Sequence, residues 1–137
     1  MAEFEFNPSL VNVEVATAYL PGHSDPEEDQ YTFAYTITIS NAGDRPVQLL
    51  SRHWVITDAD NLVQEVRGEG VVGEQPVIEP GDYFRYTSGT TLNTPVGFME
   101  GSYFMVAWDE DDDPEDAPEK FQVPIPAFTL HTPTALN

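Results

Sequence analysis

The chain lacks cysteine and contains no long apolar run. With no cysteine among its 137 residues, no disulfide supports the fold, and the hydrophobic core must hold it alone. No apolar stretch approaches the ~18 residues that a membrane-spanning helix needs, so we expect no membrane insertion. The first residues also lack the basic and apolar segments of a secretory signal. These absences together favour a cytoplasmic protein.

Basic residues are scarce as well. Five lysines and arginines stand against 24 aspartates and glutamates, which gives a formal net charge of −19, and Lys120 is the single lysine. A surface of this sign repels phosphate backbones and anionic lipids, so we expect neither nucleic acid nor membrane as a partner. The acidic excess is interpreted either as a solubilising coat or as adaptation to a salt-rich cytoplasm.

Apolar and polar residues alternate with a period of two through most of the chain. The clearest case is 31–40, where aromatic and β-branched residues alternate with small polar ones. Further strands are predicted at 11–20, 47–57, 62–67, 83–92, 101–108 and 121–130. No segment shows helical periodicity with caps, so little or no helix is expected. The pattern predicts an all-β fold, an antiparallel two-sheet sandwich of about seven to eight strands.

Particular residues refine this prediction. Trp54 lies where immunoglobulin-like sandwiches bury a tryptophan, and Tyr103 with Met105 has the spacing of a tyrosine corner. These features favour the fibronectin type III or immunoglobulin type. We expect one domain over 1–137, with a flexible N-terminal tail at 1–9, a mobile acidic loop at 109–118 and a C-terminal tail at 133–137. Pro124 and Pro126 confine the last strand to a sheet edge or split it.

Gly68, Gly70 and Gly73 have the G-x-G-x-x-G spacing of a dinucleotide-binding loop. Pro76, Pro80 and a further glycine follow so soon that a crossover helix is improbable. Without that helix no helix dipole is available to hold pyrophosphate. The glycines then serve either a bulged or sharply turned connection or an anion nest made of backbone N–H groups.

Three arginines and a histidine are the candidate partners of this loop: Arg67 adjoins it, while Arg52, His53 and Arg85 are candidates to reach it across strands. Arg52 and His53 precede Trp54. The structural interpretation is therefore an arginine at the rim and a histidine at the sheet surface, beside a core tryptophan. The functional interpretation makes them part of a recognition surface. No nucleophile or orienting partner accompanies the histidine, so we predict no catalytic residues and no enzyme activity.

An acidic run follows Trp108, with seven acids in the eight positions 109–116. Asp109, Asp111 and Asp113 match the first ligand positions of an EF-hand, but Pro114 replaces the required glycine and Lys120 the bidentate glutamate. Mutual repulsion predicts a solvated loop with at most weak, non-selective association of divalent cations. The chain's histidines, His23, His53 and His131, are isolated in sequence. We therefore predict neither a metal site nor a cofactor.

Four motifs in order resemble the ApaG family, from about residue 11 to residue 133: Ser51-Arg52-His53-Trp54, then 68–76 with its glycines, then Tyr86-Thr87-Ser88-Gly89-Thr90, then Gly97, Met99, Gly101 and Tyr103. The resemblance implies a fibronectin-III-like sandwich. It also implies a small bacterial protein associated with cobalt and magnesium efflux or tolerance, often encoded beside a dinucleoside tetraphosphatase. Similar domains in eukaryotic F-box and DNA-polymerase-interacting proteins imply protein binding. The acidic run after Trp108 departs from the family pattern.

Two function classes follow. The first is a non-enzymatic module that docks a protein partner through strand edges and the Gly68–Gly73 loop, and so acts on metal homeostasis indirectly. Ion transport itself would require a membrane-spanning structure. The second is a sensor that binds a nucleotide polyphosphate or another anion at the same loop. Homo-oligomers could form through edge strands such as 121–125, although nothing in the sequence requires it.

Overall fold

Antiparallel strands make up nearly all of the regular structure, as the alternating pattern predicts. The computed structural model describes residues 6–108 and 119–134. Within these ranges it contains no α-helix, only short 3-10 turns η1 (Pro8–Leu10), η2 (Pro21–His23) and η3 (Pro26–Glu28). The strands are β1 (Val11–Tyr19), β2 (Tyr31–Asn41), β3 (Val47–Asp58), β4 (Val63–Glu69), β5 (Val77–Ile78), β6 (Tyr83–Leu92), β7 (Val96–Ala107) and β8 (Glu119–His131).

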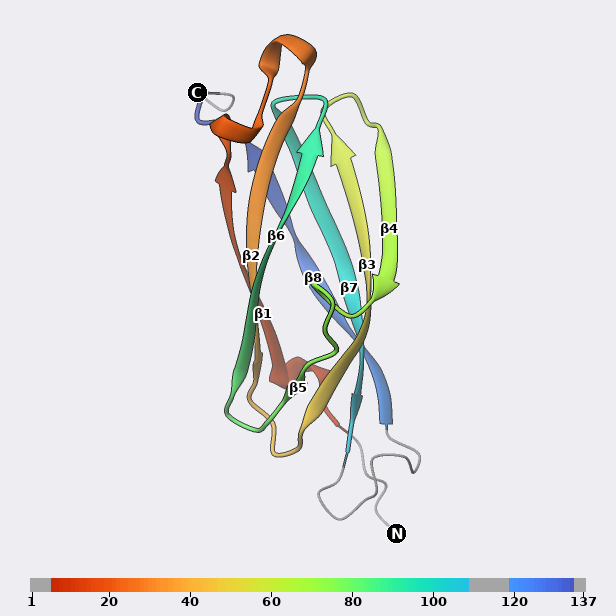
Figure 1. Cartoon of the computed structure of the whole chain (residues 1–137). Helices are drawn as coiled ribbons and strands as arrows, with labels where there is room; N and C mark the ends of the chain where they lie inside the picture. Colours follow the sequence, from red (N-terminus) through yellow and green to blue (C-terminus); the bar gives the residue numbers. More distant parts are fainter. Residues whose placement is uncertain (1–5, 109–118, 135–137) are drawn as a thin grey trace.

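The strands form two sheets that face each other as the two layers of a sandwich (Figure 1). One sheet has three strands in the order β1-β2-β6. The other has five, in the order β4-β3-β7-β8, with the short β5 also paired to β3. All pairs are antiparallel. The predicted all-β, two-sheet antiparallel fold is thus confirmed.

Strand β2 shows how the sequence pattern produces this packing. Its apolar positions, Phe33, Tyr35, Ile37 and Ile39, are all buried against the opposite sheet. The intervening threonines face outward, and Thr36 Oγ1 lies 2.8 Å from Thr87 Oγ1 on β6. One face therefore excludes water while the other forms cross-strand hydrogen bonds, as period-two patterning requires.

Trp54 lies at the centre of the core with 2% of its surface exposed. Its ring makes edge contacts with Tyr35 at 5.4 Å and with Phe128 at 5.9 Å between centroids. These neighbours come from both sheets, so the tryptophan bridges the two layers. The sequence-based placement of Trp54 in the core is confirmed.

The expected tyrosine corner is wrong. Such a corner bonds its hydroxyl to backbone a few residues upstream, whereas the Tyr103 hydroxyl bonds to the Tyr86 hydroxyl on the opposite sheet. Tyr103 itself is fully buried. The residue is a core tyrosine that links two layers.

The structure also extends what the sequence predicts at the strand ends. Strand β7 begins at Val96, five residues before the expected start at 101, and a bulge at 99–101 interrupts its pairing with β8. Strand β8 forms the sheet edge that its prolines require. The short β5 is absent from the sequence-based prediction.

Residues 6–10 belong to the folded domain, in contrast to the flexible tail expected over 1–9. Phe6 is 5% exposed and stacks on Phe121 with ring centroids 5.0 Å apart. Asn7 then accepts the Ser9 N–H in its side chain at 3.0 Å and so caps η1. The expected mobile loop at 109–118 lies outside the described residues, as do the last three residues of the tail expected at 133–137.

Candidate functional site

The glycine run forms a tight turn between strands. Val71 and Glu74 donate backbone N–H groups to each other's carbonyl oxygens at 2.8 and 2.9 Å. Between them Val72 has φ 43° and Gly73 φ 82°, the two positive values that a type I′ turn needs. No helix starts here, so no helix dipole faces a phosphate. The glycines therefore serve a sharply turned connection.

The loop's own amide groups are largely occupied. Gly70 N–H donates to Leu50 O at 2.8 Å, and the amides of Val71 and Glu74 bond each other's carbonyls. An anion nest requires successive N–H groups that are free to point at a ligand. Because the N–H groups at 70, 71 and 74 are already bonded, the loop does not offer an unbroken series of free N–H groups.

Val72 at the tip of the turn is strained and exposed. A β-branched residue at positive φ is unusual, because its side chain crowds the backbone. Yet 54% of the Val72 surface faces solvent, so burial does not offset the strain. Strained residues of this kind gather at binding sites and switches.

Arg52 is the cation that meets the loop. Its Nη1 donates to the carbonyl oxygens of Glu69 at 3.2 Å and Gly70 at 2.7 Å. The guanidinium lies over Gly68, its cross-strand partner, where an added Cβ would stand 2.8 to 2.9 Å from the guanidinium atoms. Gly68 therefore makes room for Arg52, and Arg52 fixes the carbonyls that begin the turn.

The other predicted cations lie elsewhere. His53 follows Arg52 and so projects from the opposite face of β3, where its Nε2 lies 3.1 Å from Glu65 Oε1. Arg67 is the cross-strand partner of His53 and shares that outer face. Arg85 donates from Nε to Thr38 Oγ1 at 2.9 Å on the other sheet. Of the predicted set, only Arg52 joins the glycines.

A cavity of about 250 Å³ lies beneath the turn, between the two sheets. Strands β2, β3 and β6 supply its aromatic and polar walls, and the glycine loop closes one side. The lining residues are Tyr35, Arg52, Trp54, Glu69, Val71, Val72, Gly73, Tyr86 and Ser88.

Tyr86 lines this cavity, and behind it lies Tyr103, whose hydroxyl bonds to that of Tyr86. Burial raises the pKa of Tyr86 well above its usual range, while the hydrogen bond with Tyr103 and the charge of Arg52 act in the opposite direction. Burial likewise raises the pKa of Tyr103, the neighbouring Tyr86 and Tyr35 raise it further, and Arg52 again lowers it. Both phenols are therefore neutral at physiological pH, so Arg52 brings a positive charge that they do not neutralise.

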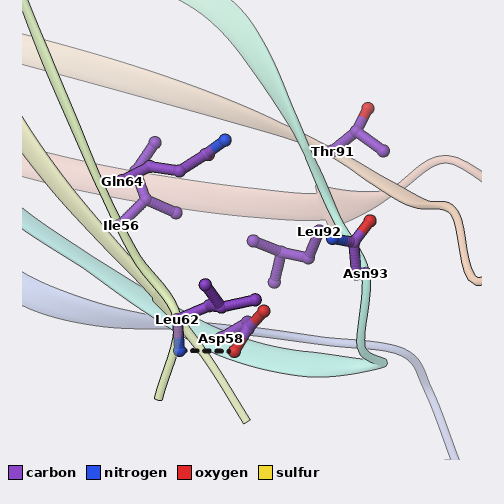
Figure 2. A pocket seen from close by; sticks show the side chains of 7 residues that line it. All are labelled: Ile56, Asp58, Leu62, Gln64, Thr91, Leu92 and Asn93. Atoms are coloured by element: carbon purple, nitrogen blue, oxygen red, sulfur yellow. Dashed lines mark hydrogen bonds between the residues drawn. The ribbon is translucent and has the colours of Figure 1, made fainter. Parts of the chain in front are cut away.

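A second cavity of about 210 Å³ lies near the turn between β3 and β4, also walled by β3, β4 and β6. Figure 2 shows its apolar floor, formed by Ile56 and Leu92, with Gln64 and Asn93 on either side. Asp58 accepts the Leu62 N–H at 3.0 Å, which closes the turn between β3 and β4. Both cavities thus open along the side of the sandwich where β4 and β6 are edge strands.

Exposed apolar residues gather on this side. Among the described residues, five of the eight large apolar side chains that stand out from the surface come from β4, the loop and the start of β5: Leu62, Val63, Val66, Val72 and Val77. Three exposed glutamates, Glu65, Glu69 and Glu74, accompany them. The segment 62–77, here called the β4 surface, therefore combines exposed apolar side chains with three glutamates and one arginine, Arg67.

In the described ranges, no group of three or more histidine, aspartate or glutamate side chains gathers to hold a metal ion. The predicted weak cation association at 109–118 lies outside those ranges. None of the helical segments described is long and apolar enough to cross a membrane.

Sequence reasoning missed the cavity residues on β2 and β6. Tyr35, Tyr86 and Ser88 meet Arg52 only because the two sheets stack, which strand alternation alone does not reveal. A signal for Arg52 was present: it lies two residues from Trp54, so alternation places both on the inner face. In β6, alternation places Phe84, Tyr86 and Leu92 on one face, but it does not reveal which residues of the other sheet they meet.

Comparison with known proteins places the chain beside one family. The profile described as "ApaG domain" matches residues 21–107. Relatives named "Protein ApaG" include that of Thiobacillus denitrificans, 57% identical over 93% of this chain and 94% of its own length. The one from Ralstonia nicotianae is 55% identical over 93% of this chain and 96% of its own.

Two solved structures are also similar to this chain over most of its length. The crystal structure of the putative ApaA protein from Bordetella pertussis is 47% identical, covers 91% of this chain and 95% of its own, and superposes with a TM-score of 0.82. A second solved structure, a structural genomics target, is 45% identical with a TM-score of 0.84 over 95% of this chain and 92% of its own. At these identities the likeness extends to sequence as well as fold.

Proposed function

The chain belongs to the ApaG domain family, and from that premise we propose that it is a non-enzymatic cytoplasmic module that docks a protein partner on the β4 surface. The observation that carries the proposal is an exposed edge strand with apolar side chains. Within the described part of the chain, β4 pairs with β3 alone, and every residue of β4 except Gly68 is exposed. Such an edge accepts an added strand through its main-chain groups, while side-chain pockets supply specificity.

The cavities beside β4 fit this mode of recognition. Gln64 and Asn93 flank the second cavity, and their side-chain amides form no hydrogen bonds within the described residues, so these amides are free to bond a partner's backbone. Ile56 and Leu92 beneath them offer an apolar floor. An extended segment laid along β4 would place alternate side chains over such pockets.

Charge restricts the partner. The net charge of −19, and the excess of the exposed Glu65, Glu69 and Glu74 over Arg67 on the β4 surface, disfavour an acidic segment. We therefore propose an extended segment in which apolar residues alternate with basic ones. The association with cobalt and magnesium efflux that the family resemblance implies would then be an indirect effect that acts through this partner.

Nucleotide sensing at the glycine loop is the weaker candidate. The amides of Gly70, Val71 and Glu74 are already bonded to protein carbonyls, and a cavity of about 250 Å³ is below the ~300 Å³ at which ligand pockets usually begin. Titration with a dinucleoside polyphosphate tests it. Saturable amide shifts at 68–74 would restore this candidate.

Site-specific photocrosslinking in cells tests docking. A photoreactive amino acid at Val63 on β4 should give one discrete crosslinked species. The same group at Phe104, an exposed apolar position on β7 that lies outside the β4 surface, should not. Adding Val72→Asn should remove the crosslink at 63. Asparagine tolerates positive φ, so this variant should fold at least as well as the parent chain.

The yields of crosslinked product at the two positions test the docking proposal. Crosslinks of equal yield at 63 and 104, or none at either, would contradict docking at β4. Cobalt tolerance measured in the same cells tests the indirect metal role: it should fall with Val72→Asn and remain with Phe104→Ser.

A further inference from the structure

Several side chains that line the cavity beneath the glycine loop carry hydrogen-bond donors with no acceptor in the protein. Tyr35 and Trp54 line it and are 6% and 2% exposed. In the described part of the chain, neither the Tyr35 hydroxyl nor the Trp54 indole N–H has a hydrogen-bond partner, and the Ser88 hydroxyl has none either. None of these three atoms is among the fully buried unpaired ones, so each reaches the open space of the cavity. They are therefore donors with no protein partner that a ligand in the cavity can engage.

Arg52 adds a positive charge with unused donors. Its Nη1 is occupied by the carbonyls of Glu69 and Gly70, but Nε and Nη2 donate to no described residue. Arg52 also forms no salt bridge with any described carboxylate. The free side of a guanidinium is planar and matches the two oxygens of a carboxylate.

Glu69 is the one acid among the lining residues, and it does not cancel this charge. Its carbonyl oxygen is the group that Arg52 binds. Strand alternation turns the Glu69 side chain away from the face of Gly68, over which the guanidinium lies, and the residue is exposed. The cavity therefore pairs one cation with several neutral donors and no opposing anion.

We propose that this cavity binds a small monocarboxylate, with the carboxylate against the free side of Arg52 and the neutral donors of Tyr35, Trp54 and Ser88 around it. A single cation in an acidic protein favours a monoanion over a phosphate dianion. The volume of about 250 Å³ suits a short acid and excludes a nucleotide polyphosphate. This site borders the β4 surface, since Glu69, Val72 and Gly73 line the cavity, but carboxylate binding does not depend on docking and is tested without any partner.

Acetate is the probe. In a ¹H–¹⁵N spectrum of the full chain, the indole signal of Trp54, distinguished from that of Trp108 by a Trp108→Phe variant, should shift saturably with sodium acetate. Sodium chloride at equal ionic strength is the control for screening, and it should leave the signal in place. Inorganic phosphate at the same pH is the control for anion type and should bind more weakly.

Tyr35→Phe separates binding from structure. The change removes a hydroxyl without a protein partner and preserves the ring, so the melting temperature should stay the same or rise. Acetate affinity should fall about tenfold, as expected for loss of one hydrogen bond to a charged group. Tyr19→Phe is the matched control, because Tyr19 packs against Phe33 on the same sheet but does not line the cavity; its acetate affinity should be unchanged.

Three results would overturn the proposal: an indole signal that follows ionic strength alone, phosphate bound as tightly as acetate, or equal acetate affinity in Tyr35→Phe and the parent chain.

Discussion

The hydroxyl of Tyr86 on β6 is hydrogen-bonded to the hydroxyl of Tyr103 on β7, and this contact joins the two sheets through the core. Both residues are buried, Tyr103 completely. Among the described residues, no other fully buried hydrogen bond connects two side chains of opposite sheets. The pair fixes how the layers face each other beneath the cavity, whereas the surrounding apolar contacts are not directional.

Removing both members of this pair should cost less than the sum of the costs of removing each one alone. Tyr86→Phe leaves the Tyr103 hydroxyl buried without its partner and should lower the free energy of unfolding by about 1–3 kcal/mol. The double variant, Phe at both positions, should lose less than the sum of the single changes. Urea unfolding of all four chains gives the coupling. Additive losses would show that the hydrogen bond contributes nothing beyond ring packing.

Stability should fall steeply above pH 10. Burial raises the pKa of Tyr86 and of Tyr103 above the ordinary value of 10.0, with the Tyr103 and Arg52 contacts partly opposing it at Tyr86. The unfolded state then releases protons at a pH where the folded state keeps them, so stability is complete below pH 10 and is lost as pH rises.

Each such tyrosine contributes a slope of about 1.4 kcal/mol per pH unit in that range. Urea unfolding at successive pH values from 9 upward measures it. A Tyr103→Phe chain should show a shallower slope than the parent chain above pH 10. Parallel pH profiles would mean that these phenols ionise normally in the folded protein.

The glycines of the loop should differ sharply in tolerance. An added Cβ on Gly70 would stand 2.2 Å from the Glu74 carbonyl oxygen, and its φ is +63°, so Gly70→Ala meets both a clash and strain. Gly73 also has positive φ, +82°, but open space around it. We expect a loss of about 3 kcal/mol for Gly70→Ala and about 1 kcal/mol for Gly73→Ala, measured by urea unfolding. Equal losses would contradict this path of the backbone through the turn.

How far the sequence predicts this structure differs from one feature to the next. Strand β2 and the core position of Trp54 follow from alternation, because a two-residue period determines which side chains share a face. That alternation also places Arg52 inside and His53 outside. What it leaves open is which residue of the other sheet lies opposite, and so the pairing of Tyr103 with Tyr86 and the cavity with Tyr35 could not be predicted.

The N-terminal segment illustrates a second limit. Phe6 ends a four-residue alternation of glutamate and phenylalanine that Asn7 and Pro8 cut short, so a tail is the natural expectation, yet its ring stacks on Phe121 of β8. A single aromatic residue docks wherever the folded domain leaves a matching apolar site, and only the assembled sheets reveal that site. Local sequence carries no record of it.

Phe6 should accordingly matter for stability. Phe6→Ala removes a side chain that is 5% exposed and should lower the free energy of unfolding by about 3 kcal/mol, the range of buried aromatic truncations. Phe98→Ala is the control, because Phe98 is 39% exposed and should lose less than about 1 kcal/mol. Thermal and urea unfolding of both variants measure these losses. Equal losses of unfolding free energy in the two variants would show that residues 6–9 behave as a tail.

Added salt should raise the melting temperature. The net charge is −19, and the described residues contain only two salt bridges, Arg45 with Asp44 and His53 with Glu65, so like-charge repulsion is little offset by pairing. Screening lengths shrink from about 10 Å at 0.1 M to about 3 Å at 1 M salt, which weakens that repulsion. A rise that continues steeply above about 1 M would favour adaptation to a salt-rich cytoplasm, since simple screening is nearly complete there.

The β4 surface supplies the matched variant for this salt dependence. Neutralising Glu69 and Glu74 to glutamine should make the dependence of the melting temperature on salt shallower, because two of the repelling charges are removed. A melting temperature that does not respond to salt in either chain would instead mean that the acidic residues are spaced widely enough to behave as a solubilising coat.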